Sequence, residues 1–168
     1  MEDGGLHQGG TVLKSNLDIN IRGLQPNEPI PYSMLLLADP SRTVVDTYID
    51  RGQLYVAVID QTIVGVMVLL DTRPGTIEIV NIAVAEEWQG RGIGKALLQH
   101  AVFQGRQQGA STLEIGTGNS SLNQLGLYQR MGFRMTGIDR GFFTRHYEEK
   151  IVENGIPCVD MIRLAMEL

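Results

Sequence analysis

The feature that most constrains how this chain folds is a glycine-rich turn at residues 88–98, which follows an apolar run and opens a helical one. Its glycines alternate along the turn, at Gly90, Gly92 and Gly94. Because glycine has no Cβ, the backbone there can adopt dihedral angles that other residues avoid and can approach a ligand closely. The first N–H groups of the following helix point outwards at the positive end of its dipole, beside the basic side chains Arg91 and Lys95. The turn therefore predicts an anion-binding site where a strand meets a helix.

The size and composition of the chain predict one globular domain. It has 168 residues, of which 43% are apolar and 20% charged, a balance typical of a single soluble domain with a sizeable core. Residues 1–15 are rich in glycine and poor in apolar side chains, so we expect a flexible leader there and the folded domain at 16–168. The longest apolar run, 63–70, is far shorter than a membrane span, and residues 1–5 lack the regions of a signal peptide. We therefore expect a cytoplasmic protein with no membrane partner.

Charge and the metal-binding residue types narrow the function further. The net charge is −5, and the fourteen Lys and Arg residues are spread along the chain, which argues against nucleic acid as a partner. The single cysteine, Cys158, cannot form an internal disulfide, in agreement with a reducing compartment. The histidines lie far apart, without the spacing of metal ligands, at His7, His100 and His146. We therefore predict no bound metal.

The order of apolar patterns and turn signals predicts an antiparallel meander followed by a crossover. Apolar runs predict strands at residues 17–22, 54–59, 63–70, 76–84, 111–115, 133–138 and 159–166. Helical patterns predict helices at 32–38, 41–52, 93–108 and 120–131, with Ser41 placed to cap the second. A strand, a long helix and a further strand indicate a parallel pair, with the glycine turn at the carboxyl end of its first strand. The tail around Phe142 and Phe143 is less regular, although Asn154-Gly155 is suited to turn a hairpin.

The spacing of the glycine turn excludes two common phosphate-binding loops. A Walker A loop would need glycine in place of Gln89 and a Ser or Thr, as the magnesium ligand, in place of Ala96. A dinucleotide-binding loop that begins at Gly90 would need glycine in place of Lys95. One that begins at Gly92 would need a small residue in place of Leu97. The strands before the turn also form a meander and not an opening βαβ unit. The turn is therefore predicted to bind neither ATP nor NAD.

A third spacing, Gln-x-x-Gly-x-Gly, is met by Gln89, Gly92 and Gly94. One helix and one strand further on stands a second signature, Asn119 followed by Leu-Tyr-Gln-Arg-Met-Gly-Phe at 127–133. With both signatures in this order, the chain from residue 17 onwards resembles the GNAT superfamily of acetyl-CoA-dependent N-acyltransferases. The resemblance implies an α/β (α+β) fold: a mixed, mostly antiparallel sheet of about seven strands, with a parallel pair at the acyl-CoA cleft and helices on both faces.

The resemblance assigns acetyl-CoA binding to the glycine turn and the strand before it. Backbone amides of the turn would replace the hydration of the pyrophosphate without a metal. This cradle consists of Gln89, Gly90, Arg91, Gly92, Ile93, Gly94 and Lys95. The strand residues Ile82, Ala83 and Val84 would pair with the pantetheine arm, and a backbone N–H among them would stabilise the oxyanion. Asn119 resembles the asparagine that bonds the same arm in the family, while a helix cap is its alternative role.

The transfer itself needs a stabilised oxyanion, a neutral amine and a protonated leaving thiolate. Tyr128 corresponds to the family's tyrosine that donates a proton to the thiolate, and packing against the pantetheine arm is the alternative. Primary amines, with pKa values of about 10, are mostly protonated at neutral pH, so a base or a water relay assists. Glu78 stands among apolar strand neighbours, and its offset from Arg91 resembles that of a glutamate base in the histone-acetylating branch. By alternation Glu78 can also face solvent, which leaves Glu114 or a water relay as alternative bases.

We therefore expect an acetyl-CoA-dependent N-acetyltransferase that transfers an acetyl group directly to a primary amine of a small molecule or peptide. The alternative is a non-catalytic acyl-CoA-binding sensor or assembly module of the same fold. Members of this fold differ in acceptor choice in the region that corresponds to residues 142–160, and the residues here do not identify the acceptor. A strand-rich tail can also pair between subunits, so a homodimer is a further expectation.

Overall fold

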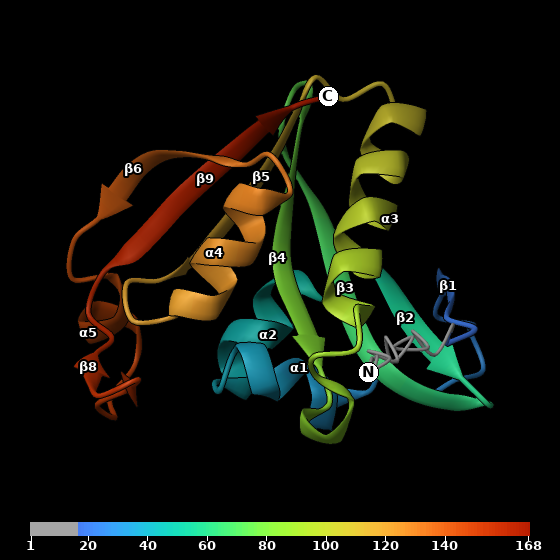
Figure 1. Cartoon of the computed structure of the whole chain (residues 1–168), viewed down its shortest axis with the longest axis horizontal. Coiled ribbons are helices and arrows are strands. Elements are labelled where there is room, and N and C mark those ends of the chain that lie inside the picture. Colours follow the sequence, from blue (N-terminus) through green and yellow to red (C-terminus); the bar gives the residue numbers. More distant parts are fainter. Residues whose placement is uncertain (1–16) are drawn as a thin grey trace, which may run out of the picture.

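The computed structural model describes residues 17–168, and the expected leader at 1–15 lies outside them. Its centre is a seven-stranded mixed sheet in the order β1-β2-β3-β4-β5-β9-β6, beside a two-stranded ribbon of β7 and β8 (Figure 1). The sheet strands are β1 Asn20–Gly23, β2 Gln53–Ile59, β3 Thr62–Arg73, β4 Thr76–Val84, β5 Thr112–Gly118, β6 Arg134–Asp139 and β9 Met161–Glu167. The ribbon strands are β7 Val152–Glu153 and β8 Ile156–Pro157. The prediction of a mixed sheet of about seven strands is confirmed.

Strands β1 to β4 form the expected antiparallel meander. A tight turn joins β2 to β3 at Asp60 and Gln61, whose φ values of 46° and 66° suit a two-residue hairpin loop. The prediction that β1 begins at Leu17 is wrong, since the strand begins at Asn20. Asn20 pairs with Val58, one residue before β2 ends, so that earlier residues have almost no partner strand left.

Strands β4 and β5 form the expected parallel pair, but the pair is short. Residues 76–79 of β4 pair with residues 112–115 of β5. Beyond them β4 stays paired with β3 up to Val84, and β5 stays paired with β9 up to Gly118. The two strands therefore diverge (Figure 1) and leave two unpaired edges facing each other. We call this opening, between residues 80–84 and 116–118, the β4–β5 splay.

Helices cover both faces of the sheet, as expected (Figure 1). They are α1 Tyr32–Ala38, α2 Arg42–Tyr48, α3 Ile93–Gln107, α4 Leu122–Arg130 and α5 Phe142–His146, with one turn of 3-10 helix, η1, at Glu86–Trp88. Helices α3 and α4 pack on one face in a core that includes Leu97, and α1 and α2 pack on the other in a core that includes Leu35. The hydroxyl of Ser41 caps α2 by accepting from the backbone N–H of Val44 at 3.3 Å, which confirms the predicted cap.

The C-terminal tail is more regular than the sequence indicated. Phe142 and Phe143 open helix α5, which begins after Gly141 in the left-handed conformation at a φ of 70°. The prediction of an irregular stretch is wrong there, because five helical residues are too few to show a periodic apolar face. The turn expected at Asn154-Gly155 is confirmed, since both residues have positive φ, 53° and 71°, and join β7 to β8. No helix within residues 17–168 is long and apolar enough to cross a membrane.

Two glycines on β5 allow the C-terminal tail to lie directly on the sheet. A Cβ at Gly116 would lie 2.7 Å from Sδ of Met161, and one at Gly118 would lie 2.4 Å from Sγ of Cys158. A side chain at either position would therefore push the tail outwards. The glycines alternate with Ile115, which belongs to the core on the α3 face. The tail consequently lies on the same face of the sheet as α1 and α2.

Candidate functional site

The glycine turn is an open connection between η1 and α3. Gly90 and Gly92 have φ values of 74° and 87°, a region that residues with a side chain rarely adopt. An added Cβ at either position would meet no atom of the described chain within 4 Å. Helix α3 begins directly after Gly92, and Ala96 N donates to Gly92 O at 3.0 Å. The backbone N–H groups of residues 93–95 therefore have no acceptor within the helix and point towards this free space.

Side chains of the turn hold it in this shape. Gln89 donates from Nε2 to the carbonyl O of Val84 at 3.1 Å, which ties the turn to the end of β4. The guanidinium of Arg91 lies over the Trp88 ring, 4.8 Å from its centroid, in a cation–π contact. Through its bond to Val84, Gln89 positions the turn. The second cation, Lys95, is exposed in the first turn of α3. The free amides with two cations beside them are suited to a diphosphate.

A β-bulge lies in β4 where the splay begins. Leu69 pairs with Ile79, but its neighbour Val68 pairs with Asn81, which leaves Val80 as the extra residue. Val80 packs on the α1–α2 core, and the side chain of Asn81 forms hydrogen bonds within the same core. Both side chains therefore face α1 and α2, and the backbone of β4 turns locally at the mouth of the splay.

The strand residues predicted to bind the pantetheine arm lie along the open edge of β4, at Ile82, Ala83 and Val84. Because β3 occupies the other edge, alternate backbone N–H and C=O groups of this stretch point into the splay. Such groups can pair with an extended chain in the manner of an added strand. At the end of this edge, an added Cβ at Gly94 would lie 3.7 Å from Leu127, so the N-terminus of α3 lies beside α4.

Tyr128 lies on α4 and is almost completely buried, with 4% of its surface exposed. Its ring packs against Phe133, with 6.2 Å between the centroids, in the core between α3, α4 and the sheet. Burial raises the pKa of the Tyr128 phenol, which keeps it protonated at neutral pH. A proton donor must be protonated, but the raised pKa also makes the phenol a weaker acid. The role of Tyr128 in the transfer therefore stays a prediction.

Asn119 lies at the end of β5, and its side chain contacts the C-terminal tail. Its Nδ2 donates to Pro157 O at 3.0 Å, and its Oδ1 accepts from Val159 N at 2.8 Å and from Asp160 N at 3.0 Å. The alternative role as a helix cap is wrong, because the N-cap of α4 is Ser121. These bonds to the tail use both acceptor positions of Oδ1 and one of the two N–H groups of Nδ2, and the predicted contact of Asn119 with the pantetheine arm stays a prediction.

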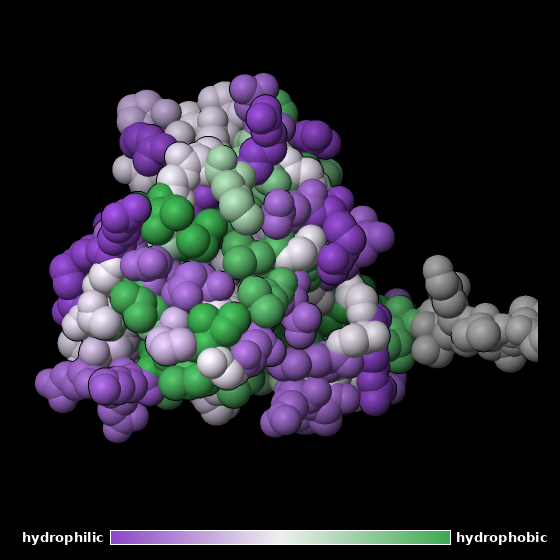
Figure 2. Space-filling view, turned by 60° about the vertical axis from the view of Figure 1, so that its left-hand side comes forward, coloured by the Kyte–Doolittle hydropathy of each residue, from purple (hydrophilic) through white to green (hydrophobic). Residues whose placement is uncertain are grey.

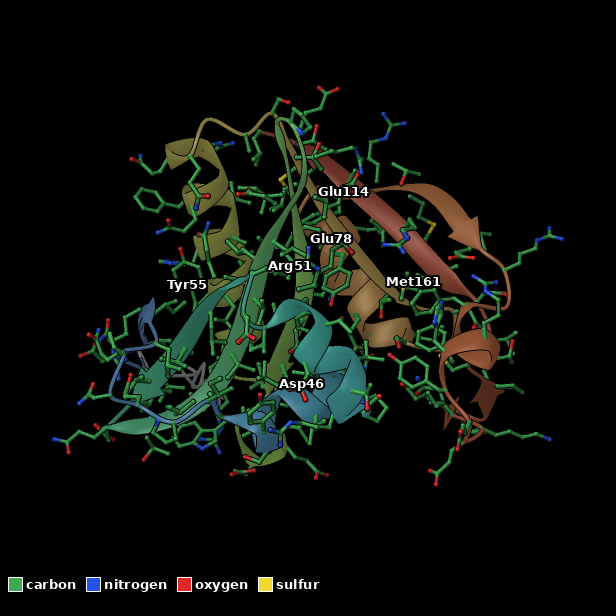
Figure 3. The ribbon with its side chains drawn as sticks, turned by 180° about the vertical axis from the view of Figure 1, so that it is seen from behind. Asp46, Arg51, Tyr55, Glu78, Glu114 and Met161 are labelled. Atoms are coloured by element: carbon green, nitrogen blue, oxygen red, sulfur yellow. The ribbon has the colours of Figure 1, made fainter. Side chains whose placement is uncertain are left out.

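Two glutamates face the α1–α2 side of the sheet from neighbouring strands (Figure 3). Glu78 of β4 pairs in register with Glu114 of β5. Arg163 of β9 donates to Glu78 at 3.1 Å, and Arg73 at the end of β3 forms an ion pair with Glu114. Burial raises the pKa of Glu78, and Arg163 opposes this shift. Glu78 is therefore a half-buried carboxylate beside the splay, more basic than an ordinary glutamate, as a general base requires.

A buried polar network that the sequence did not indicate lies beside the bulge. Asp39, at the corner between α1 and α2, accepts from Tyr147 Oη at 2.9 Å and from Tyr48 Oη at 3.4 Å. Tyr48 Oη in turn accepts from Nδ2 of Asn81 at 2.9 Å. Burial raises the pKa of Asp39, while its hydrogen bonds oppose the shift. In the sequence Asp39-Pro40 reads only as a helix stop, since Tyr147 stands 108 residues further on. We call the side chains of Asp39, Tyr48, Asn81 and Tyr147 the Asp39 network.

Comparison with known proteins gives the class to which this site belongs. Residues 24–133 match the profile of the Acetyltransferase (GNAT) family. An uncharacterized N-acetyltransferase of Bacillus subtilis, YvbK, is 53% identical over 146 residues, which cover 87% of this chain and 94% of that protein. The chain belongs to the GNAT family, and it is an acetyl-CoA-dependent N-acetyltransferase.

Solved structures extend this agreement to the whole fold. An IAA acetyltransferase from Bacillus cereus has a TM-score of 0.86 and 59% identity over 89% of this chain and 99% of its own. A GNAT family acetyltransferase from Elizabethkingia anophelis, with acetyl-CoA bound, has a TM-score of 0.87 and 49% identity over 89% of this chain and 98% of its own. The predicted family, fold and enzyme class are therefore confirmed. Among residues 17–168 no group of three His, Cys, Asp or Glu side chains is placed to hold a metal ion.

Proposed function

We propose that this acetyltransferase acts on a primary amine of a small molecule or peptide, and that the amine approaches from the α1–α2 side of the sheet. The observation that carries this proposal is the β4–β5 splay, which has the open glycine turn near one end and the paired strand residues Glu78 and Glu114 just beyond the other. One end offers free amides for a diphosphate, and the other offers a carboxylate for an amine. Acetyl-CoA, which carries a diphosphate and a thioester, supplies the activated acetyl group.

The glycine turn and the edge of β4 would hold acetyl-CoA. The amides that follow Gly92 bind the pyrophosphate, while Arg91 and Lys95 add positive charge. Residues 82–84 align the pantetheine arm as an added strand and direct a backbone N–H at the carbonyl oxygen, where negative charge develops. The fit is supported by the free space beside the turn, and by Gln89, which fixes the turn through Val84 without a ligand.

Two side chains move protons in the proposed transfer. Glu78 takes one proton from the acceptor's ammonium group, so that the nitrogen lone pair can attack the acyl carbon. As the C–N bond forms and the C–S bond breaks, Tyr128 gives its proton to the departing sulfur and regains one from the nitrogen. Glu78 then releases its proton to solvent. The raised pKa strengthens Glu78 as a base, and Tyr128 carries its proton at neutral pH, as a donor must.

A thiol-release assay tests this function against the alternative of a non-catalytic acyl-CoA sensor. The protein is incubated with acetyl-CoA and a panel of acceptors, which includes the IAA named for the Bacillus cereus relative. Acceptor-dependent release that falls by about 100-fold or more in Glu78→Gln supports the enzyme and its base. The matched control is Glu114→Gln, the register partner, for which we expect a much smaller fall. Tight acetyl-CoA binding with no thiol release from any acceptor would support the sensor.

We further propose that the protein is a cytoplasmic homodimer that pairs along β6. This strand is an edge of the sheet, and Met135 and Ile138 on it are more than half exposed. Figure 2, in which the β6 side is turned forward, shows apolar side chains gathered among polar ones. A second copy along β6 would cover both the strand edge and these side chains. Light scattering of the wild type and of Ile138→Lys tests this: a monomeric wild type would contradict it.

A further inference from the structure

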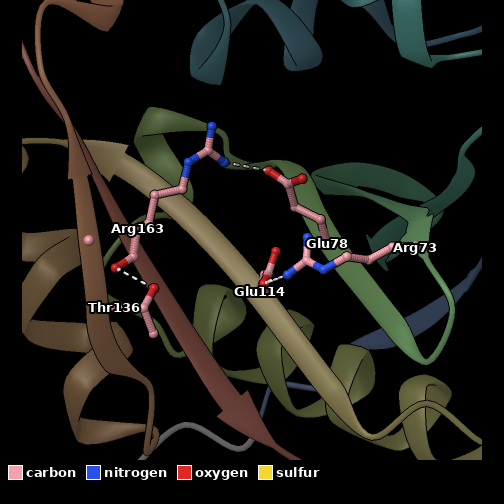
Figure 4. Close-up of a pocket in the computed structure, with 6 residues that line it drawn as sticks. Arg73, Glu78, Glu114, Thr136 and Arg163 are labelled. Atoms are coloured by element: carbon pink, nitrogen blue, oxygen red, sulfur yellow. Dashed lines mark hydrogen bonds and ion pairs between the residues drawn. The ribbon is translucent and has the colours of Figure 1, made fainter.

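A charged hollow lies on the α1–α2 side of the sheet, next to the splay. It has a volume of about 460 Å³. Figure 4 draws the residues that line it. They are Arg73, Glu78, Glu114, Thr136, Gly137 and Arg163. The glutamates alternate along their strands with residues of the α3-side core, which places the hollow on the opposite face of the sheet from α3. The hollow therefore opens on the side from which we propose that the amine approaches.

Two glutamates and two arginines line the hollow, so that their charges sum to zero. Glu78 and Glu114 stand on adjacent strands, roughly 5 Å apart at the backbone, and each is paired with one arginine. The side chains of Arg73 and Arg163 remain 59% and 39% exposed. A guanidinium has five N–H donors, so both arginines keep donors that can turn to a ligand. Such a site disfavours a polyamine, because the arginines repel a second cation.

The hollow is within reach of the reacting atoms. Val80, the bulge residue at the mouth of the splay, stands two residues beyond Glu78 on the same face, roughly 7 Å along the strand. An amine held at Glu78 therefore lies near the point where the proposed arm of acetyl-CoA would end. The rest of the acceptor must then lie among the arginines of the hollow.

We propose that the hollow selects zwitterionic acceptors, in which a carboxylate lies a few bonds from the amine, as in a free amino acid. The acceptor's carboxylate replaces Glu78 as the partner of Arg163, and the released Glu78 carboxylate takes the proton from the acceptor's ammonium group. Charge balance is kept, since one carboxylate exchanges for another at the same guanidinium. This inference rests on the proposed function, because it places the acceptor amine at Glu78.

Pairs of acceptors that differ only in the carboxylate test the proposal. The pairs are tyrosine and tyramine, histidine and histamine, and lysine and cadaverine. We expect the amino acid of an accepted pair to have a kcat/KM at least roughly tenfold above that of its decarboxylated amine, as a charge-assisted hydrogen bond allows. In Arg163→Gln this ratio should fall towards one, mainly through KM. The control Arg106→Gln, on an exposed position of α3, should keep the wild-type ratio.

A binding measurement separates failure of this inference from failure of the proposed function. Calorimetry with CoA present and with 3-(4-hydroxyphenyl)propionate, 3-(imidazolyl)propionate or 6-aminohexanoate, each lacking the α-amine, reports the carboxylate contact without any turnover. Binding of at least one acid that is lost in Arg163→Gln supports the hollow even if no thiol is released. The inference is overturned if no acid binds, if the decarboxylated amines are the better substrates, or if Arg163→Gln changes both members of each pair by the same factor.

Discussion

Tyr147→Phe tests how strongly the Asp39 network holds the molecule together. The substitution removes the hydroxyl that donates to Asp39 at 2.9 Å and that joins the α1–α2 corner to the segment after α5. A hydrogen bond to a charged group contributes about 1.5–3 kcal/mol. Tyr147 is half-buried, and Asp39 keeps two other donors, Tyr48 Oη and the N–H of Ser41. We therefore expect the free energy of unfolding to fall by about 1–2 kcal/mol.

Urea unfolding, followed by the fluorescence of the single tryptophan, Trp88, measures this loss. Tyr32→Phe is the matched control, because Tyr32 also donates to an aspartate at 2.9 Å, Asp46, but on an exposed surface. We expect the control to lose less than about 0.5 kcal/mol, since exposed contacts between side chains contribute little. If Tyr147→Phe were no more destabilising than the control, the strength assigned to the buried bond would be refuted.

The same network predicts a dependence of stability on pH. Burial raises the pKa of Asp39 in the folded protein above its value in the unfolded chain, about 3.9. Between these two pKa values the folded protein binds more protons than the unfolded chain, so the contribution of Asp39 to stability falls as pH rises. Asp39→Asn cannot titrate and lacks this slope. Its stability relative to the wild type should therefore improve as pH rises above about 4, and the opposite trend in urea unfolding would contradict the raised pKa.

Three further substitutions test the site and the fold. Gly92→Asp should abolish acetyl-CoA binding in calorimetry, because a φ of 87° strains any side chain and the carboxylate repels a diphosphate, whereas retained binding would place the cradle elsewhere. Tyr128→Phe should lower kcat by roughly tenfold or more with little change in acetyl-CoA affinity, and an unchanged kcat would assign the proton to water. Gly118→Ala should lower the free energy of unfolding by about 1–3 kcal/mol, since its Cβ would lie 2.4 Å from Sγ of Cys158, and an unchanged Tm would contradict this packing.

Features with local signals were predicted from the sequence. The meander follows from alternation and turn residues, and the position of Ser41 before an apolar helix was enough to predict its cap. The glycine spacing around Gly92 predicted a strand–helix turn, which the structure shows as an open connection to α3. Each of these signals depends on residues within a few positions of each other, so it can be recognised in a single sequence.

Features that depend on distant partners were not predicted. The bulge at Val80 arises from its register with β3 and leaves no mark on the apolar pattern of β4. Asp39 and Tyr147 meet only because the tail packs back on the sheet. No local pattern in the sequence marks Arg163, which reaches Glu78 from a strand 85 residues further on. The proposed acceptor site is built mainly from such contacts, which explains why the acceptor half was harder to predict than the cofactor half.

The short contact between β4 and β5 gives the sheet a seam. Four residue pairs join its two halves, β1–β4 on one side and β5, β9 and β6 on the other. An extended ligand between these strands would close the seam and connect both halves along their length. Its binding energy would then appear as slower hydrogen exchange not only at residues 80–84 but also in β9 and β6, which lie beyond β5. The two halves of such a sheet are held together more firmly when the co-substrate lies between β4 and β5. The bound co-substrate then serves as an additional strand of the sheet for as long as it stays.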